Sequence, residues 1–231
     1  MANTLNTPTQ GFQTYARMEG GSPTGGQTPV WIASTDPGLM FRGDPVVTST
    51  SPGANLSGNY ITALNTVNTS SAGFLVRGIF QGCYQFQPAA GRVVWSNFYN
   101  GTVTGSTGDI KAYINDDISE LFVAQASTRG AITSSMIGLN IGVTFNTSTG
   151  NTTFGYSNIT VESTSVASLS SMPFRLVAYY SDYAVPGGLA GPAGAGTTPF
   201  INGTDNTSPA NMVVVRFNNC DRLQLTSKSS T

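Results

Sequence analysis

The sequence predicts an all-β fold, a compact β-barrel or β-sandwich with an extended N-terminal arm and a long Gly/Pro-rich loop before the last strand. Short apolar runs of strand length recur along the chain, separated by Gly, Pro, Asn and Asp turns. No amphipathic pattern of helical spacing reaches ten residues. Charged residues are only 9% of the chain, against about 25% in an average protein. Many short strands with turns between them are typical of sandwiches and barrels.

The first element is the arm, residues 1–28. It is rich in Gly and Pro, and its widely spaced apolar side chains are Phe12, Tyr15 and Met18. A segment of this kind has too few apolar residues to form a core element of its own. An arm with a few spaced anchors is suited to lie along a neighbouring subunit. We therefore expect Phe12, Tyr15, Arg17 and Met18 to contact a partner.

Residues 29–222 are expected to form a single β domain. Its expected strands are 30–33, 45–50, 60–64, 74–86, 93–99, 110–114, 121–126, 141–145, 152–156, 159–162, 174–180 and 212–217. Gly78 and Gly82 interrupt the longest apolar run and predict a bulge or tight bend there. Asn115-Asp116-Asp117 is expected to be a turn between strands, and NTSTGN a hairpin turn. One helical turn is expected at 133–139, with Thr133 as its N-cap.

Residues 183–210 interrupt the strands with a long loop rich in Gly, Ala and Pro. Loops of this length are uncommon within compact domains and are usually functional or mobile. Its apolar residues Val185, Leu189 and Phe200 are second candidates for partner contacts. Residues 223–231 are expected to form a flexible C-terminal tail.

Histidine is absent from the chain. This removes Ser-His and Cys-His pairs, the usual general base near pH 7 and the commonest transition-metal ligand. The sequence therefore predicts no enzymatic activity, no metal and no cofactor. The two cysteines, Cys83 and Cys220, lie in or beside apolar runs, which favours buried, reduced thiols.

The charge and hydropathy patterns exclude other partners. A net charge of -1 leaves no basic excess for nucleic acid. No apolar run is long enough to span a membrane. The N-terminal stretch MANTLNTPTQGF lacks the basic and apolar regions of a secretory signal.

Three groups of residues have both a functional and a structural interpretation. Arg42-Gly43-Asp44 is a cell-adhesion tripeptide, but Gly, Asp and the following Pro45 favour a turn that leads into a strand. Asp116, Asp117 and Glu120 could serve acid/base chemistry or hold Ca²⁺, whereas Asn-Asp-Asp is also ordinary turn chemistry. A third group could form a platform for sugars, although strand aromatics are more often core or interface residues. Its members are Trp31, Trp95, Phe98 and Tyr99.

The order of the motifs along the chain resembles that of the capsid decoration, or cement, proteins of tailed bacteriophages. The motifs are GFQTYARMEGGSP, VWIAS, FRGDPVVTS, LVRGIFQGCYQF, WSNFY, IKAYINDDISELFVAQAS, MIGLNIGVTFNTSTGNTTFGYSNITVES, FRLVAYY and NMVVVRFNN. The resemblance covers about residues 10–222. The loop at 183–210 is longer and richer in Gly than the resemblance suggests.

The resemblance implies a structural protein of the virion, made in the host cytoplasm and bound to the outer surface of the expanded capsid. It implies the major capsid protein and neighbouring copies of the chain as partners, in a dimer or a trimer. In this role the protein holds capsid subunits together against the pressure of packaged DNA. The alternative is another virion β module, such as a tail domain or a receptor- or carbohydrate-binding domain.

Overall fold

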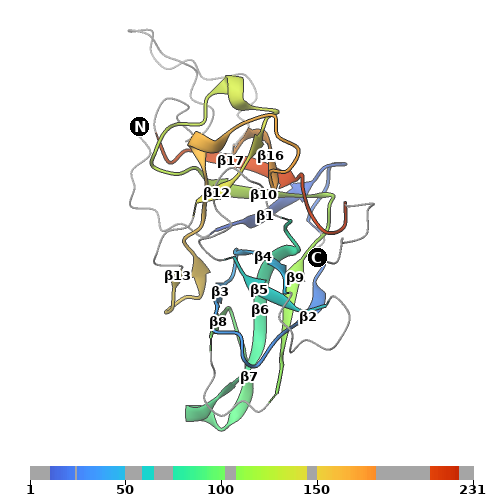
Figure 1. Ribbon diagram of the computed structural model, residues 1–231, viewed down its shortest axis with the longest axis vertical. Coiled ribbons are helices and arrows are strands. Elements are labelled where there is room, and N and C mark those ends of the chain that lie inside the picture. Colours follow the sequence, from blue (N-terminus) through green and yellow to red (C-terminus); the bar gives the residue numbers. More distant parts are fainter. Residues whose placement is uncertain are drawn as a thin grey trace, which may run out of the picture.

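The computed structural model describes residues 11–23, 25–49, 59–64, 75–101, 108–144, 150–180 and 209–223. Over these ranges the protein is built from antiparallel sheets, with helical structure limited to three-residue 3₁₀ turns. Two larger sheets follow each other along the long axis of the molecule (Figure 1). The all-β prediction is confirmed, although the described strands do not close into a barrel. In the described ranges no helix has the length and apolar character needed to cross a membrane.

The sheet that we call sheet A has five strands in the order β1-β10-β17-β16-β11. These strands are β1 (Gln13–Arg17), β10 (Glu120–Gln125), β17 (Met212–Phe217), β16 (Phe174–Tyr179) and β11 (Asn140–Ile141). Strands β16 and β17 are adjacent although more than thirty residues separate them in the chain. The long 183–210 segment therefore connects two neighbouring strands.

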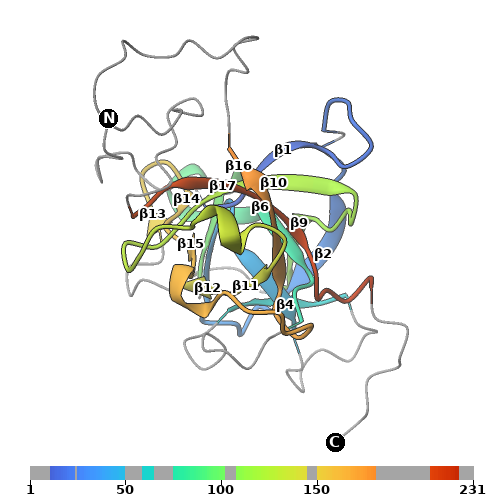
Figure 2. The same ribbon diagram turned by 90° about the horizontal axis from the view of Figure 1, so that it is seen from above.

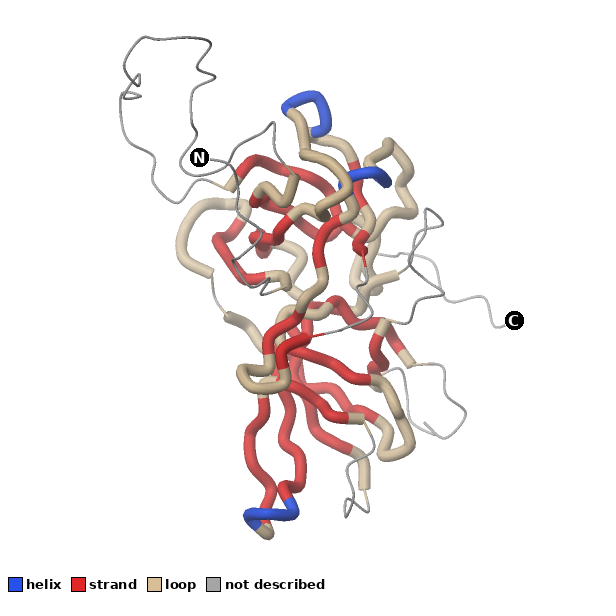
Figure 3. Tube along the Cα trace, turned by 90° about the vertical axis from the view of Figure 1, so that its left-hand side faces the viewer, coloured by secondary structure: helices blue, strands red, loops and turns tan. Residues whose placement is uncertain are grey.

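The other large sheet, sheet B, has the order β2-β9-β6-β4-β5, and β7 also pairs with β6. Its strands are β2 (Thr28–Ile32), β9 (Ile110–Asn115), β6 (Gly78–Gln87), β4 (Pro45–Thr48), β5 (Ile61–Ala63) and β7 (Arg92–Ser96). The β6–β7 hairpin, with the 3₁₀ turn η2 (Pro88–Ala90) at its tip, projects away from the rest of the domain (Figure 3). Seen from above, sheet A lies over the ends of the sheet B strands (Figure 2).

Three two-stranded pairs complete the fold. They are β3 (Leu39–Phe41) with β8 (Phe98–Asn100), β12 (Val143–Thr144) with β15 (Thr160–Val161), and β13 (Gly150–Asn151) with β14 (Tyr156–Ser157). Two further 3₁₀ turns are η3 (Ser134–Met136) and η4 (Ser163–Ser165).

Each large sheet has its own hydrophobic cluster. The cluster of sheet A centres on aromatic and branched side chains, among them Phe12, Phe122, Ile132, Val161, Phe174, Leu176, Val215 and Phe217. The cluster of sheet B contains Val30, Ile32, Met40, Val46, Ile61, Phe80, Cys83, Tyr99, Ile110, Ala112 and Ile114. Ile79 of β6 belongs to the first cluster and its neighbour Phe80 to the second, so β6 joins the two cores.

The predicted arm is wrong from Phe12 to Arg17. Residues 13–17 form β1, which pairs with β10 at the edge of sheet A. The Phe12 side chain is only 1% exposed, and its ring stacks on Phe174 with centroids 4.4 Å apart. Composition suggested a free arm because apolar residues are sparse there, but one buried ring and a strand pairing are enough to fix the segment. Residues 1–10 lie outside the described part of the chain.

The predicted turn at Asn115-Asp116-Asp117 is present between two strands, but the predicted hairpin around NTSTGN is wrong. The Asn115-Asp116-Asp117 segment connects β9 to β10, which lie in different sheets, so the chain passes here from sheet B to sheet A. Strand β12 pairs with β15, and residues 152–155 form a turn instead of a strand. Turn chemistry marks where a strand ends, but it does not identify the strand's partner.

The strand expected at 93–99 and the N-cap expected at Thr133 differ from the prediction in detail. The expected strand at 93–99 is split at Asn97 into β7 and β8, because the Ser96 hydroxyl accepts a hydrogen bond from the Phe98 N–H and ends the ladder. The turn at η3 is present, but Thr133 makes no capping hydrogen bond through its side chain. Its hydroxyl lies 3.0 Å from that of Ser135 instead.

The bulge predicted in the longest apolar run is confirmed. The pairing of β6 with β9 shifts register between Phe80 and Gly82, and Gly82 has a φ of 147°. An added Cβ at this position would lie 2.4 Å from an indole carbon of Trp95 and 2.7 Å from the Ser96 carbonyl oxygen. The glycine therefore permits both the irregular backbone and the close approach of Trp95.

Candidate functional site

The first candidate surface is the β1 edge, which we define as Tyr15, Arg17 and Met18. Within the described ranges, β10 is the only strand paired with β1. Tyr15 is 40% exposed and Met18 47% exposed. The Tyr15 ring makes an edge contact with Tyr180 at 5.4 Å between centroids. Three of the four predicted arm anchors therefore lie on the edge strand β1 or directly after it.

Weak polar contacts hold the β1 edge in place. The Arg17 guanidinium lies 3.6 Å from a carboxylate oxygen of Asp117. The Met18 N–H donates to the Ser119 carbonyl at 2.8 Å, and Arg216 points a guanidinium N–H at the Met18 sulfur. A partly exposed ion pair with this long separation contributes less than about 1 kcal/mol. The side chains of the edge are therefore accessible to a partner at small cost.

The other predicted contact residues have different outcomes. Phe12 is buried in the core of sheet A and cannot reach a partner. Val185, Leu189 and Phe200 lie outside the described residues.

The second candidate surface is the outer face of sheet B. We call it the aromatic face and define it as Trp31, Tyr84, Trp95, Tyr113 and Lys111. Trp31 of β2 and Tyr84 of β6 are both in register with Lys111 of β9, and Trp95 of β7 is opposite Tyr84. Neighbours in register point to the same side of a sheet. The four residues therefore form one row across four strands, with Tyr113 beside it.

The rings of Tyr84, Trp95 and Tyr113 are in contact with one another, while Lys111 lies between Trp31 and Tyr84 in the row. Tyr84 meets Trp95 edge-on at 5.3 Å between centroids, and Trp95 meets Tyr113 at 5.7 Å. The Lys111 ammonium lies 5.6 Å from the centre of the Tyr113 ring. These geometries are favourable for aromatic and cation–π pairs, so they fix the orientation of the rings.

The sequence identified only part of this surface. Trp31 and Trp95 are exposed as the platform required, but Tyr99 is fully buried, and its hydroxyl donates to the Asp36 carbonyl at 2.8 Å. Phe98 is half-buried and stacks on Phe41. Tyr84 and Tyr113 were missed. In IKAYIN the residues Lys111 and Tyr113 alternate with the buried Ile110, Ala112 and Ile114, and this alternation is the signal that could have placed Tyr113 on the outer face.

We expect Gly82→Ala to disturb the aromatic face. The new methyl group would overlap the Trp95 ring and the Ser96 carbonyl, and φ would be unfavourable. The expected cost is about 2–4 kcal/mol of unfolding free energy, together with a change in tryptophan emission. Gly138→Ala is the matched control, because its φ of 91° is also positive but an added Cβ meets nothing within 4 Å. Equal losses in urea denaturation of the two variants would contradict the packing role of Gly82.

The Arg42-Gly43-Asp44 tripeptide is a buried turn, as the structural interpretation predicted. The Asp44 carboxylate is 5% exposed and accepts a hydrogen bond from the Phe41 N–H at 2.7 Å. The Gly43 carbonyl accepts from the Phe12 N–H at 2.9 Å. Burial raises the pKa of Asp44 to about 7, and the hydrogen bonds from Ser157 and Phe41 oppose this only in part. The turn joins β3 to β4 and does not display its carboxylate to a receptor.

The acidic residues near the β9–β10 link have structural partners. The Asp116 carboxylate is 2.9 Å from the Arg77 guanidinium and 3.0 Å from that of Arg222, and it accepts from the Thr28 hydroxyl. Asp117 accepts from the Ser119 N–H in the turn, while Glu120 is buried. In the ranges that the structure describes, no group of three or more metal-ligating acidic or Cys side chains occurs. The turn interpretation accounts for Asp116 and Asp117.

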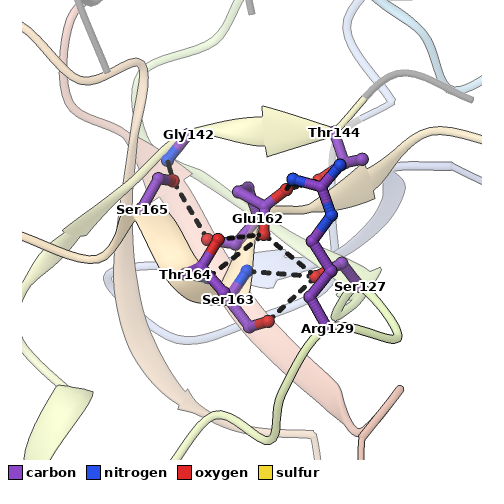
Figure 4. A network of polar contacts seen from close by, with 8 residues as sticks. All are labelled: Ser127, Arg129, Gly142, Thr144, Glu162, Ser163, Thr164 and Ser165. Carbon is purple, nitrogen blue, oxygen red and sulfur yellow. Dashed lines mark hydrogen bonds and ion pairs between the residues drawn. The ribbon is translucent and has the colours of Figure 1, made fainter. Parts of the chain in front are cut away.

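A polar network around Glu162 fixes the η4 turn against β12 (Figure 4). The Glu162 carboxylate accepts from the hydroxyls of Ser127, Thr144 and Thr164 and pairs with Arg129 at 3.1 Å. Burial alone would raise the pKa of Glu162, but the bonds from Thr144 and Thr164 and the charge of Arg129 outweigh it and lower the pKa. These partners use the acceptor capacity of the carboxylate, so the network is structural.

Both cysteines are buried and free, as predicted. Burial raises the pKa of Cys83 to about 12 and also raises that of Cys220. A thiol that stays protonated is a poor nucleophile, so neither residue suits covalent chemistry.

The described part of the chain therefore offers two exposed surfaces and no assembled set of reactive groups. No family model matches the chain, and neither a curated protein nor a solved structure matches it.

Proposed function

We propose that the protein is a capsid decoration protein, which binds the outer surface of an expanded icosahedral shell and holds neighbouring major capsid protein subunits together. The order of sequence motifs suggests this role. The observation that carries it is the β1 edge, where Tyr15 and Met18 remain exposed on a folded β domain. Exposed aromatic and Met side chains are enriched in protein interfaces.

The paired strand β1 would bind a shell differently from the free arm expected from the sequence. A free arm would lose conformational freedom when it ordered on the shell, and this loss would weaken binding. Here residues 13–17 are already held by β10, so the β1 edge is pre-organised. Many copies on a repetitive lattice would make modest individual contacts collectively strong.

Co-sedimentation with undecorated shells tests this proposal. We expect saturable binding to expanded shells of the cognate major capsid protein and none to unexpanded procapsids. The double variant Tyr15→Ala, Met18→Ala should weaken binding by about tenfold or more, since interface anchors contribute about 1–2 kcal/mol each. The number of copies bound at saturation would distinguish a dimer from a trimer at the symmetry sites.

Leu169→Ala is the matched control for this experiment. Leu169 is an exposed apolar residue, 50% accessible, next to β11 at the opposite edge of sheet A. It should bind shells like the original protein. Equal binding by the double variant and this control would refute the role of the β1 edge, and failure to bind either type of shell would refute the decoration role itself.

A further inference from the structure

We propose that the aromatic face of sheet B is a binding site for a neutral oligosaccharide. This function is independent of shell binding, because the aromatic face and the β1 edge lie on different sheets.

The large rings of the row are exposed to solvent. Trp31, Tyr84 and Trp95 are each about 40% exposed, while the residues that flank Trp31 on β2, Val30 and Ile32, are completely buried. Three large aromatic side chains in one row are therefore left in contact with water. Solvated Trp and Tyr side chains concentrated on one face of a sheet indicate a binding surface.

The size and shape of the row suit an extended ligand. Neighbouring strands lie about 4.8 Å apart, so a row across four strands is about 14 Å long. This length suits several linked sugar rings better than a single one. The rings of Tyr84, Trp95 and Tyr113 are also held by their mutual contacts, and Trp95 packs closely on Gly82. These rings therefore lose little freedom when a ligand stacks on them.

The exposed area and the charge of the aromatic face limit which ligand fits. A large aromatic residue has about 150–250 Å² of surface, so the exposed parts of these three side chains add up to about 200–300 Å². A stable protein interface buries about 800 Å² on each partner, so the row is too small for a second copy of the chain. Lys111 is the only charged side chain of the aromatic face, which disfavours nucleic acid and other polyanions.

The polar groups of the aromatic face complete the fit. The Trp95 indole N–H is 3.3 Å from the Asn97 side-chain oxygen, a long contact that leaves this edge of the ring beside a polar group. The Lys111 ammonium and the Tyr84 and Tyr113 hydroxyls supply further hydrogen-bonding atoms. Apolar surface with a few placed polar groups is what binding sites for small ligands have in common. A neutral sugar matches both, since it has apolar C–H faces and a rim of hydroxyls.

Tryptophan fluorescence provides a direct test, because the chain has only two Trp residues and both lie on this face. The intact protein is titrated to millimolar concentration with neutral hexasaccharides of glucose (α1,4- and β1,4-linked), mannose and N-acetylglucosamine. A heparin hexasaccharide serves as the anionic comparison. We expect a saturable change in emission with at least one neutral sugar and a weaker response to heparin.

Variants then assign the binding to the row. Trp31→Ala should weaken binding at least tenfold by calorimetry, while Trp31→Phe, which keeps an aromatic ring, should retain most of it. Phe154→Ala is the control, since Phe154 is 65% exposed but lies outside the aromatic face. Thermal unfolding checks that each variant is folded. If Trp31→Ala is not folded, the Trp31→Phe variant keeps the test decisive.

Three results would overturn the proposal. These are no response to any neutral sugar, preferential binding of heparin, and self-association of the protein that Trp31→Phe or Trp95→Phe abolishes. Shell binding by the Trp31 variants should equal that of the original protein, so failure of this proposal leaves the decoration role unaffected.

Discussion

Replacing Phe12 by Ala should lower the free energy of unfolding by about 3–5 kcal/mol, the usual cost of removing a buried Phe side chain. The ring is almost completely buried and stacks on Phe174, within the cluster that also holds Phe122 and Phe217. The same change should release β1, because Phe12 is the buried residue that precedes this edge strand. Urea denaturation measures the first effect. Amide hydrogen exchange at Thr14 and Ala16 measures the second.

Neighbouring residues provide the controls for this prediction. Tyr15→Ala and Met18→Ala remove exposed side chains from the same segment and should change the unfolding free energy by no more than about 1 kcal/mol. If Phe12→Ala were as stable as these two variants, residues 12–17 would be the free arm that composition suggested, and the pairing of β1 with β10 would contribute nothing.

The second large effect is a pH dependence from Asp44. Its pKa is about 7 in the folded protein, against an ordinary value of 3.8 for an Asp side chain, because burial disfavours the charged form. The folded protein therefore retains a proton that the unfolded chain loses. The contribution of Asp44 to stability is fully present below about pH 4 and is lost as pH rises to about 7. Each pKa unit corresponds to about 1.36 kcal/mol, so the loss reaches up to about 4 kcal/mol.

Asp44→Asn isolates this contribution. The amide is always neutral, and its oxygen can still accept from the Phe41 N–H. We expect the variant to be more stable than the original protein at pH 8 and similar to it at pH 4, in urea denaturation at both values. Equal differences at the two pH values would rule out a buried, protonated Asp44.

Asp109→Asn is the control of opposite sign. The Tyr60 hydroxyl and the Ser34 N–H donate to Asp109 and lower its pKa. Its contribution to stability is therefore present above the ordinary pKa of an Asp and lost as pH falls through the lowered value. Asp109→Asn should destabilise the protein at pH 8, where Asp44→Asn stabilises it.

The sequence was informative where a strand is long and apolar. The runs at β6, β10, β16 and β17 are recognisable because a buried strand needs branched and aromatic residues whatever its partner is. The bulge at Gly82 was also predictable, since a glycine inside such a run weakens a regular strand and often marks a bulge. Strand β1 was missed because QTYAR has no buried residue, and its stability comes from Phe12 and from backbone pairing.

Local sequence patterns do not show which strands pair with each other. The link from β9 to β10 was predicted as a turn between strands, and only the position of β10 between β1 and β17 shows that the chain changes sheets there. The aromatic face was half predicted for the same reason. Trp95 and Tyr99 are four residues apart in WSNFY, so a regular strand would place both rings on the same side of the sheet. The strand break at Asn97 instead points the Tyr99 side chain into the core of sheet B. Which side a ring faces depends on a strand break of one residue.

The pairing of β1 with β10 also determines when the domain can fold. Gln13 is opposite Val123, so more than a hundred residues must be synthesised before β1 has a partner. At about 5–20 residues per second, this interval lasts on the order of 5–20 s on the ribosome. Strand β10 in turn requires β17, at residues 212–217, on its other side. Sheet A is therefore completed only after residue 217 has been synthesised, and its folding should be slow, as is usual for sheets built from distant segments.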